Sequence, residues 1–165
     1  MKQLPYGRIA YRENYSSILD AGKGTCSTKH ALIAALAKEL NISLELHMGI
    51  FLLTPSTMPN TESILKSYQL EAIPESHCYL KYASRTLDIT FPHLQLFSFD
   101  ADLLQEISMT LEKIGSFKVD YHQQFIRRWI KDKPHLTFDQ VWKAREEWIK
   151  NLNTNQNKNN FLIIE

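Results

Sequence analysis

A glycine-rich stretch that runs directly into an apolar helix is the strongest constraint on how this chain can fold. It reads Gly-Lys-Gly-Thr-Cys-Ser-Thr-Lys-His-Ala over residues 22–31. The two glycines give the backbone freedom before the helix begins. The alanines and leucines that follow, up to Leu40, have the spacing of a helix face that packs closely on a sheet. Cys26 lies at the junction, where free backbone N–H groups and the positive end of the helix dipole favour a thiolate. This position suits a nucleophile.

The composition predicts one globular domain and excludes several functional classes. The chain has 165 residues, of which 44% are hydrophobic and 22% are charged, and its net charge is +1. We therefore expect no nucleic-acid or anionic-membrane partner, because both need a concentrated basic surface. The N-terminus lacks the apolar segment of a signal peptide, and no run approaches the ~18 apolar residues of a membrane span. The two cysteines are then expected to be free thiols in a cytoplasmic protein.

Apolar periodicity and turn signals give the expected order of elements. We expect a turn at residues 5–7 and a short helix over 8–19, with Arg8 and Arg12 on its solvated face. Residues 94–116 leave two alternatives open, a helix from Asp100 to about Gln105 or an extended segment over 107–111. The remaining elements are a helix from Cys26 that Asn41 ends in a left-handed cap, strands over 44–53, 76–83 and 86–91, and helices over 61–70, 119–130 and from Thr137 to about 150.

These elements predict an α+β fold in a single domain. The domain spans residues 1–152, with its core at 22–92 and a C-terminal helical part at 100–152. Three tryptophans of that part are expected to fill the core between its two last helices. The Asn-rich segment from 151 to 160 is too polar to bury a core, so we expect a polar, mobile tail over 153–165. It ends in the apolar residues 161–164, which are expected to dock as an edge strand.

A nucleophilic cysteine needs a base within hydrogen-bond reach, and the base needs a group that orients it. Of the six histidines, His77 fits best, because a tight turn pairs its strand with the strand that carries Asp88. If Tyr82 pairs with Arg85, His77 and Asp88 lie diagonally on one face of the sheet, close enough for an imidazole to meet a carboxylate. Cys78 then points to the opposite face and is expected in the core.

The other histidines are assigned simpler positions. His30 lies a full helical turn beyond Cys26, so its ring is expected to meet core or solvent rather than the sulfur. We expect surface positions for His93, His122 and His135. A zinc site formed by both cysteines with His30 and His77 has suitable ligand types. It is disfavoured because neighbouring residues in a strand point apart. We therefore expect no metal and no cofactor.

Three short motifs, in this order, are similar to those of the transglutaminase-like superfamily. They are Gly24-Thr25-Cys26 at a helix start, His77-Cys78-Tyr79 in a strand, and Asp88-Ile89-Thr90 in the next strand. The resemblance covers about residues 22–92 and implies a papain/transglutaminase-like core, in which a nucleophile helix packs on an antiparallel sheet. It matches Cys26 to the nucleophile, His77 to the base and Asp88 to the orienting carboxylate. Tyr79 departs from the tryptophan usual in that family, the hairpin is short, and no proline follows Asp88.

The resemblance implies acyl transfer through a thioester on Cys26, with an amide or ester as substrate. His77 takes the thiol proton, Asp88 holds the imidazole, and the Cys26 backbone N–H binds the oxyanion. Asn14, Tyr15 and Gln3 are weaker candidates for the second oxyanion donor. Hydrolysis and transamidation remain open, as does the oligomeric state. Two other functions also remain open, a non-catalytic binding domain and an acyltransferase that uses a thioester donor.

Overall fold

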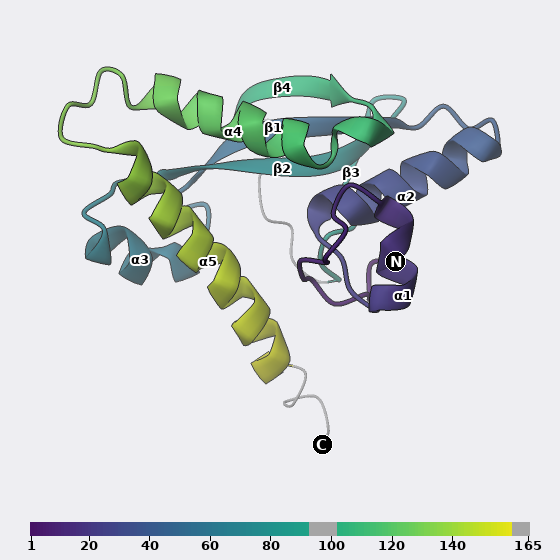
Figure 1. Cartoon of the computed structure of the whole chain (residues 1–165), viewed down its shortest axis with the longest axis horizontal. Coiled ribbons are helices and arrows are strands. Elements are labelled where there is room, and N and C mark those ends of the chain that lie inside the picture. Colours follow the sequence, from purple (N-terminus) through teal and green to yellow (C-terminus); the bar gives the residue numbers. More distant parts are fainter. Residues whose placement is uncertain (93–101, 160–165) are drawn as a thin grey trace.

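A computed structural model describes residues 1–92 and 102–159 of the chain (Figure 1). These residues form a mixed α+β fold with one four-stranded antiparallel sheet in the order β3-β2-β1-β4. The strands are β1 (Glu45–Leu53), β2 (Ile73–Tyr82), β3 (Arg85–Leu87) and β4 (Leu103–Met109). The α-helices are α1 (Ile18–Ala21), α2 (Cys26–Glu39), α3 (Glu62–Ser67), α4 (Ser116–Trp129) and α5 (Phe138–Asn159). Short 3-10 turns lie at Tyr15–Ser17 (η1), Pro59–Thr61 (η2) and Leu111–Lys113 (η3).

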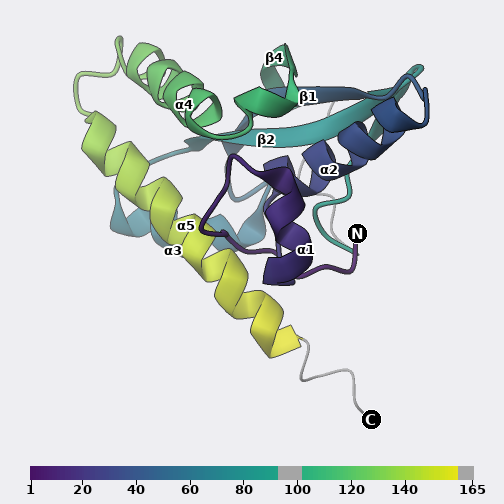
Figure 2. The same ribbon diagram turned by 45° about the vertical axis from the view of Figure 1, so that its right-hand side comes forward.

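Helices cover both faces of the sheet. Figures 1 and 2 show α1 and α2 toward one end of the sheet, and α3 beside α5 toward the other. On one face, Met48, Cys78 and Leu80 pack against Ala31 and Ala34 of α2. Because side chains alternate along a strand, the neighbouring residues face the other side. The sheet therefore separates two apolar clusters and contributes side chains to both.

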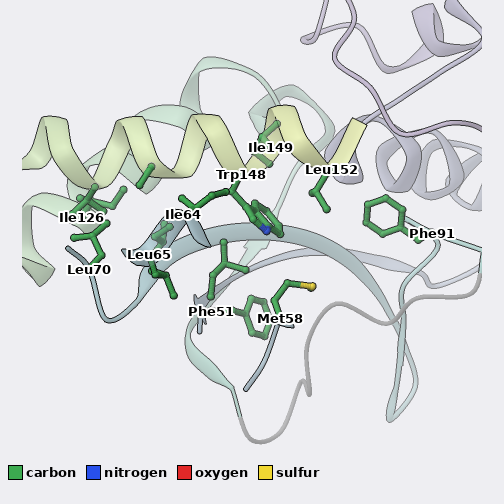
Figure 3. Packing of buried hydrophobic residues seen from close by; sticks show 14 of the residues in the cluster. Phe51, Met58, Ile64, Leu65, Leu70, Phe91, Ile126, Trp148, Ile149 and Leu152 are labelled. Carbon is green, nitrogen blue, oxygen red and sulfur yellow. The ribbon is translucent and has the colours of Figure 1, made fainter. Parts of the chain in front are cut away.

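The larger cluster joins the opposite sheet face to α3 and α5. Trp148, which is 1% exposed, points from α5 toward the sheet near Phe51 and Met58 (Figure 3). Burial of a side chain of this size is among the largest single apolar contributions to a core of this kind. Trp129 and Trp142 are partly buried and pack against the same cluster. The tryptophans thus join the helices to the sheet, whereas the sequence predicted packing between the two last helices only.

The α2 helix begins and ends as its sequence predicts. Thr25 is the N-cap, and its backbone N–H donates to Oγ1 of Thr28 at 2.9 Å in a capping box. At the other end Asn41 has φ 55°, the left-handed conformation expected of a C-terminal cap. The first residue of the helix proper is Cys26. The local sequence therefore fixes where the cysteine lies on the helix.

The predicted hairpin has the predicted register but a shorter second strand. Tyr82 pairs with Arg85, as expected from the tight turn. The strand predicted over 86–91 is too long, because β3 ends at Leu87, which pairs with Leu80. Beyond that pair, β2 has no β3 partner. Residues 88–91 follow a separate path, on which Thr90 is fully buried and Phe91 is 3% exposed.

Of the two alternatives left open for residues 94–116, the extended one holds for residues 107–109, because Leu103–Met109 form β4, which pairs with β1. Three expectations about the remaining segments are wrong in the described residues. The segment near Asn151 is not an irregular tail, because α5 continues to Asn159. Residues 8–14 are not helical, and Leu19 is 67% exposed rather than inward. Tyr6 forms an extended bridge with Gly24 instead of a turn.

Arg8 and Arg12 also differ from the sequence expectation. Arg8 does not lie on a helix, and it donates two hydrogen bonds to Glu146 of α5 at 2.7 and 2.9 Å. Two expectations concern residues outside the described part of the chain and stay predictions, namely the surface position of His93 and the edge strand at 161–164.

Candidate active site

The N-terminus of α2 presents the Cys26 thiol at the edge of strand β2. His77 and Cys78 both lie close enough to Cys26 to lower the pKa of its thiol. These two are neighbours in β2, so their side chains point to opposite faces of the sheet. A sulfur that reaches both must lie beside the edge of the strand. The edge is open there because β3 pairs with β2 only from Leu80 onward.

His77 and Asp88 form the hydrogen bond that the hairpin register predicts. Nε2–H of His77 donates to Oδ2 of Asp88 at 2.8 Å, and both side chains are buried. Asp88 is itself held in place, because its Oδ1 accepts from the backbone N–H of Thr90 at 2.9 Å. With Nε2 committed to the carboxylate, Nδ1 is the ring nitrogen left to face Cys26. Thus the three predicted residues meet, in the order sulfur, imidazole, carboxylate.

His30 hydrogen-bonds to the backbone on both sides of this arrangement, at Cys26 and at Ile89. Its Nδ1–H donates to the backbone oxygen of Cys26 at 2.7 Å, and its Nε2 accepts from the backbone N–H of Ile89 at 2.8 Å. Acceptance at Nε2 requires a neutral ring, and burial lowers the pKa of His30 to about 4. Its approach to Asp88 at 3.4 Å is therefore not an ion pair at neutral pH. The expectation that this ring meets the core is confirmed, and it ties the nucleophile helix to the segment after Asp88.

Lys118 is the neighbour of the sulfur that the sequence did not reveal. Its Nζ donates to Sγ of Cys26 at 3.3 Å, although Lys118 comes from α4, far along the chain. The side chain is only 9% exposed. The buried face of α4 consists of Lys118, His122 and Ile126, one helical turn apart. Two of these three residues are polar, so the pattern of apolar residues alone does not predict this buried face. The four-residue spacing of the three residues does place them on one side of the helix.

His122 is buried rather than on the surface as expected. It is 1% exposed, its Nε2–H donates to the backbone oxygen of Pro74 at 2.8 Å, and its Nδ1 accepts from the Ser76 hydroxyl at 3.2 Å. Burial lowers the pKa of His122 to about 4, so the ring is neutral. It anchors α4 on β2 and thereby positions Lys118. By contrast His135 is exposed, as expected.

A cavity of about 500 Å³ opens beside Cys26. Its walls come from the N-terminal segment, the start of α2, strand β2, and helices α4 and α5. Cys26, Ser27 and Lys118 line it, as do Glu75 and Arg145. Asn14, Tyr15 and Gln3, the weaker candidates for an oxyanion donor, are not among its lining residues. Cys26 lines this cavity although the residue is only 4% exposed.

A buried ion pair between Glu75 and Arg145 forms part of the cavity wall. Arg145 of α5 donates to the two carboxylate oxygens of Glu75 at 2.7 and 2.8 Å. It also donates to Glu146 at 2.7 Å, which Arg8 binds from the N-terminal segment. Burial alone would raise the pKa of Glu75, but Arg145 holds the pKa of that carboxyl below its usual value. The network therefore joins α5, β2 and the N-terminal segment around the cavity.

The charges around the sulfur favour a thiolate. The hydrogen bond from the Cys78 thiol lowers the pKa of Cys26 most; Lys118 and His77 add to this, and burial opposes it. In return, the thiolate and burial raise the pKa of Cys78 well above its ordinary value. Burial would lower the pKa of His77, yet Asp88 and the thiolate raise it to about 10. These shifts favour a Cys26 thiolate beside a His77 imidazolium.

Comparisons with protein-family models, with curated proteins and with solved structures find no match for this chain. The assignment of a function thus rests on the residues and their geometry. Among residues 1–92 and 102–159, no cluster of three or more histidine, cysteine or acidic side chains is arranged to hold a metal ion. No helix in the same part of the chain has the length and apolar character needed to cross a membrane.

Proposed function

We propose that the protein is a cysteine-dependent acyl-transfer enzyme that acts on an amide or ester. The observation that carries this proposal is the position of His77, whose ring contacts the Cys26 thiol and donates to Asp88 at 2.8 Å. A nucleophile, a base and an orienting carboxylate in this sequence are the requirements of acyl transfer. The cavity beside Cys26 gives a substrate access to the sulfur.

In the proposed mechanism, the Cys26 thiolate attacks the carbonyl carbon of the substrate. The new S–C bond forms while the carbonyl electron pair moves to oxygen, and the backbone N–H of Cys26, at the free start of α2, donates to that oxyanion. The intermediate collapses to a thioester as His77 gives its proton to the leaving group. Asp88 keeps the imidazole in the required orientation throughout. Water or an amine, whose proton passes to His77, then attacks the acyl carbon; the S–C bond breaks and Cys26 leaves as the thiolate.

The chain order of the three residues supports a papain/transglutaminase-like core as the finer fold assignment. In this proposal α2 is the nucleophile helix, and β2 and the segment after β3 carry the base and the carboxylate. Tyr79, at the position where the superfamily has tryptophan, is 1% exposed and packs in the larger core, which suits a large aromatic residue there. The two unpaired thiols suit a reducing compartment, so we propose a cytoplasmic location.

Acylation by p-nitrophenyl acetate tests the proposed function. The folded protein is mixed with this ester, nitrophenolate release is followed by absorbance, and the acetylated residue is located by mass spectrometry. We expect rapid acetylation of Cys26 at pH 7, none in Cys26→Ala, and a rate at least about 100-fold lower in His77→Ala. Lys131→Met, which removes an exposed lysine that does not line the cavity, is the matched control and should be acetylated like the wild type. An equal rate in His77→Ala, or acetylation of Cys78 in place of Cys26, would contradict the proposal.

A non-catalytic binding domain is the second candidate, and the low exposure of the nucleophile favours it. Cys26 is only 4% exposed, less than a substrate-ready thiol requires unless the cavity admits the carbonyl directly to the sulfur. On that reading the buried thiol, imidazole and carboxylate serve as a polar structural network. The two candidates differ in one observation, since a binding domain remains unmodified by the ester under conditions in which an acyl-transfer enzyme is acetylated.

A further inference from the structure

The contact between Lys118 and the nucleophile has no counterpart in the three-residue arrangement described above. Lys118 lies on the first turn of α4, and its ammonium donates to Sγ of Cys26 at 3.3 Å. The residue is 9% exposed, so its charge is largely removed from water. A buried ammonium is costly unless another group compensates for it. The position of this cation beside a sulfur therefore calls for an explanation.

Two simpler roles fit the contacts poorly. Lys118 is not needed as the partner of Glu75, because Arg145 already binds both oxygens of that carboxylate at 2.7 and 2.8 Å. It is also unsuited to act as the base. Burial would lower the pKa of Lys118, but the Cys26 thiolate raises it above the ordinary lysine value, so the amine keeps its proton at neutral pH. The residue is a fixed positive charge at the point where the anion forms.

The location of Lys118 in the cavity indicates what this charge faces during a reaction. Cys26 and Lys118 both line the cavity, together with Ser27. A carbonyl carbon bonded to the sulfur places its oxygen one bond farther away, within reach of groups that already touch the sulfur. A useful oxyanion donor must lie about 3 Å from that oxygen. The Lys118 ammonium is 3.3 Å from the sulfur, so it lies beside the carbon that the sulfur would bond and near the oxygen on that carbon.

We propose that Lys118 is a catalytic residue that, together with the backbone N–H of Cys26, forms the oxyanion-binding site. The inference rests on the proposed acyl-transfer function and supplies the second donor that the sequence did not identify. When the S–C bond forms, the negative charge moves from Sγ to the former carbonyl oxygen, and the Lys118 ammonium hydrogen-bonds to that oxygen. When the intermediate collapses, the C=O bond reforms, the leaving group departs with the proton from His77, and Lys118 keeps all its protons.

Two reactions of the same sulfur separate this role from simple stabilisation of the thiolate. Iodoacetamide alkylates a thiolate by displacement and forms no oxyanion, whereas p-nitrophenyl acetate acylates it through a tetrahedral oxyanion. Both rates are measured against pH for the wild type and Lys118→Met, and are compared on the high-pH plateau, where Cys26 is fully ionised in each protein. We expect the plateau alkylation rate to change less than about threefold and the plateau acylation rate to fall about 100-fold or more.

Further variants keep the test decisive. Lys118→Arg retains a cation with several donors and should keep acylation within about tenfold of the wild type. Lys131→Met removes an exposed lysine that does not line the cavity and should change neither reaction. Circular dichroism confirms that each variant is folded. If Lys118→Met is unfolded, Lys118→Gln takes its place, because it keeps a neutral donor and should fall between the methionine and arginine results expected above.

The outcomes distinguish this inference from the proposed function. Equal plateau losses in both reactions, or no loss of acylation in Lys118→Met, would overturn the oxyanion role while Cys26 remains an acyl acceptor. A lack of acetylation of wild-type Cys26 by the ester would instead refute the proposed function, and the role of Lys118 with it. Selective loss of acylation that arginine restores is the result expected from the geometry.

Discussion

Removal of Arg145 tests whether the buried ion pair holds the cavity wall together. Glu75 is 4% exposed and Arg145 is 9% exposed, and the two groups share hydrogen bonds of 2.7 and 2.8 Å. Arg145→Met leaves the carboxylate buried without its cation. Breaking a buried pair in this way typically costs about 3–5 kcal/mol. A domain of this size is usually stable by about 5–15 kcal/mol, so the loss is readily measured.

The assay is urea denaturation at pH 7, followed by tryptophan fluorescence and by circular dichroism. Arg8→Met is the matched control, because Arg8 and Glu146 form a partly exposed pair, with side chains that are 50% and 33% exposed. Such a pair contributes at most about 1 kcal/mol. In the double variant Glu75→Gln/Arg145→Met no unpaired charge remains, so much of the loss should be recovered.

The pH determines how large the stability difference between the wild type and Arg145→Met is. In the wild type the folded-state pKa of Glu75 is lowered, so the pair contributes stability above the unfolded-state pKa of about 4.3 and loses it as the pH falls. Without Arg145, burial raises the folded-state pKa of Glu75, and protonation relieves the penalty as the pH falls. The difference between wild type and Arg145→Met should therefore shrink from pH 7 to pH 5. A loss below about 1 kcal/mol at pH 7, or a difference independent of pH, would refute the reasoning.

Two further predictions concern stability. His30 and His122 have a pKa of about 4 in the folded state, below the unfolded-state value of about 6.5, so the unfolded state takes up their protons first. The free energy of unfolding should therefore fall between pH 6.5 and pH 4, by up to about 1.4 kcal/mol per pH unit for each ring. In His122→Gln, the free energy of unfolding measured in urea should depend less on pH in that range. The same pH dependence as in the wild type would argue against this. Gly49→Ala should cost about 1–3 kcal/mol in thermal unfolding, because a Cβ there would lie 2.5 Å from the Phe51 ring and 2.6 Å from Leu103. An unchanged melting temperature would contradict that result.

The elements that the sequence predicted well are those whose ends carry local signals. The capping residues of α2 and the left-handed Asn41 are local features, and they placed Cys26 at the helix start. The turn after Tyr82 determined the hairpin register, and with it the bond between His77 and Asp88. These three candidate residues were therefore accessible from short-range rules.

The parts that could not be predicted depend on contacts between distant segments. Strand β4 is only partly buried and owes its conformation to pairing with β1, so its own sequence resembled a helix as much as a strand. His122 was expected on the surface, and Lys118 was not singled out, because nothing near them in the chain shows that α4 packs His122 against β2. The contact between Cys26 and Cys78 was missed for a similar reason, since strand alternation does not show that the sulfur lies at an open edge.

The walls of the cavity come from both halves of the chain, whereas the proposed reacting residues come from its N-terminal part only. Cys26, His77 and Asp88 all precede residue 92, whereas much of the lining belongs to α4 and α5. Substitutions in the two late helices can thus reshape the space offered to an acyl group and leave the reacting atoms in place. The reacting groups and the part of the lining that comes from α4 and α5 can therefore change independently of one another.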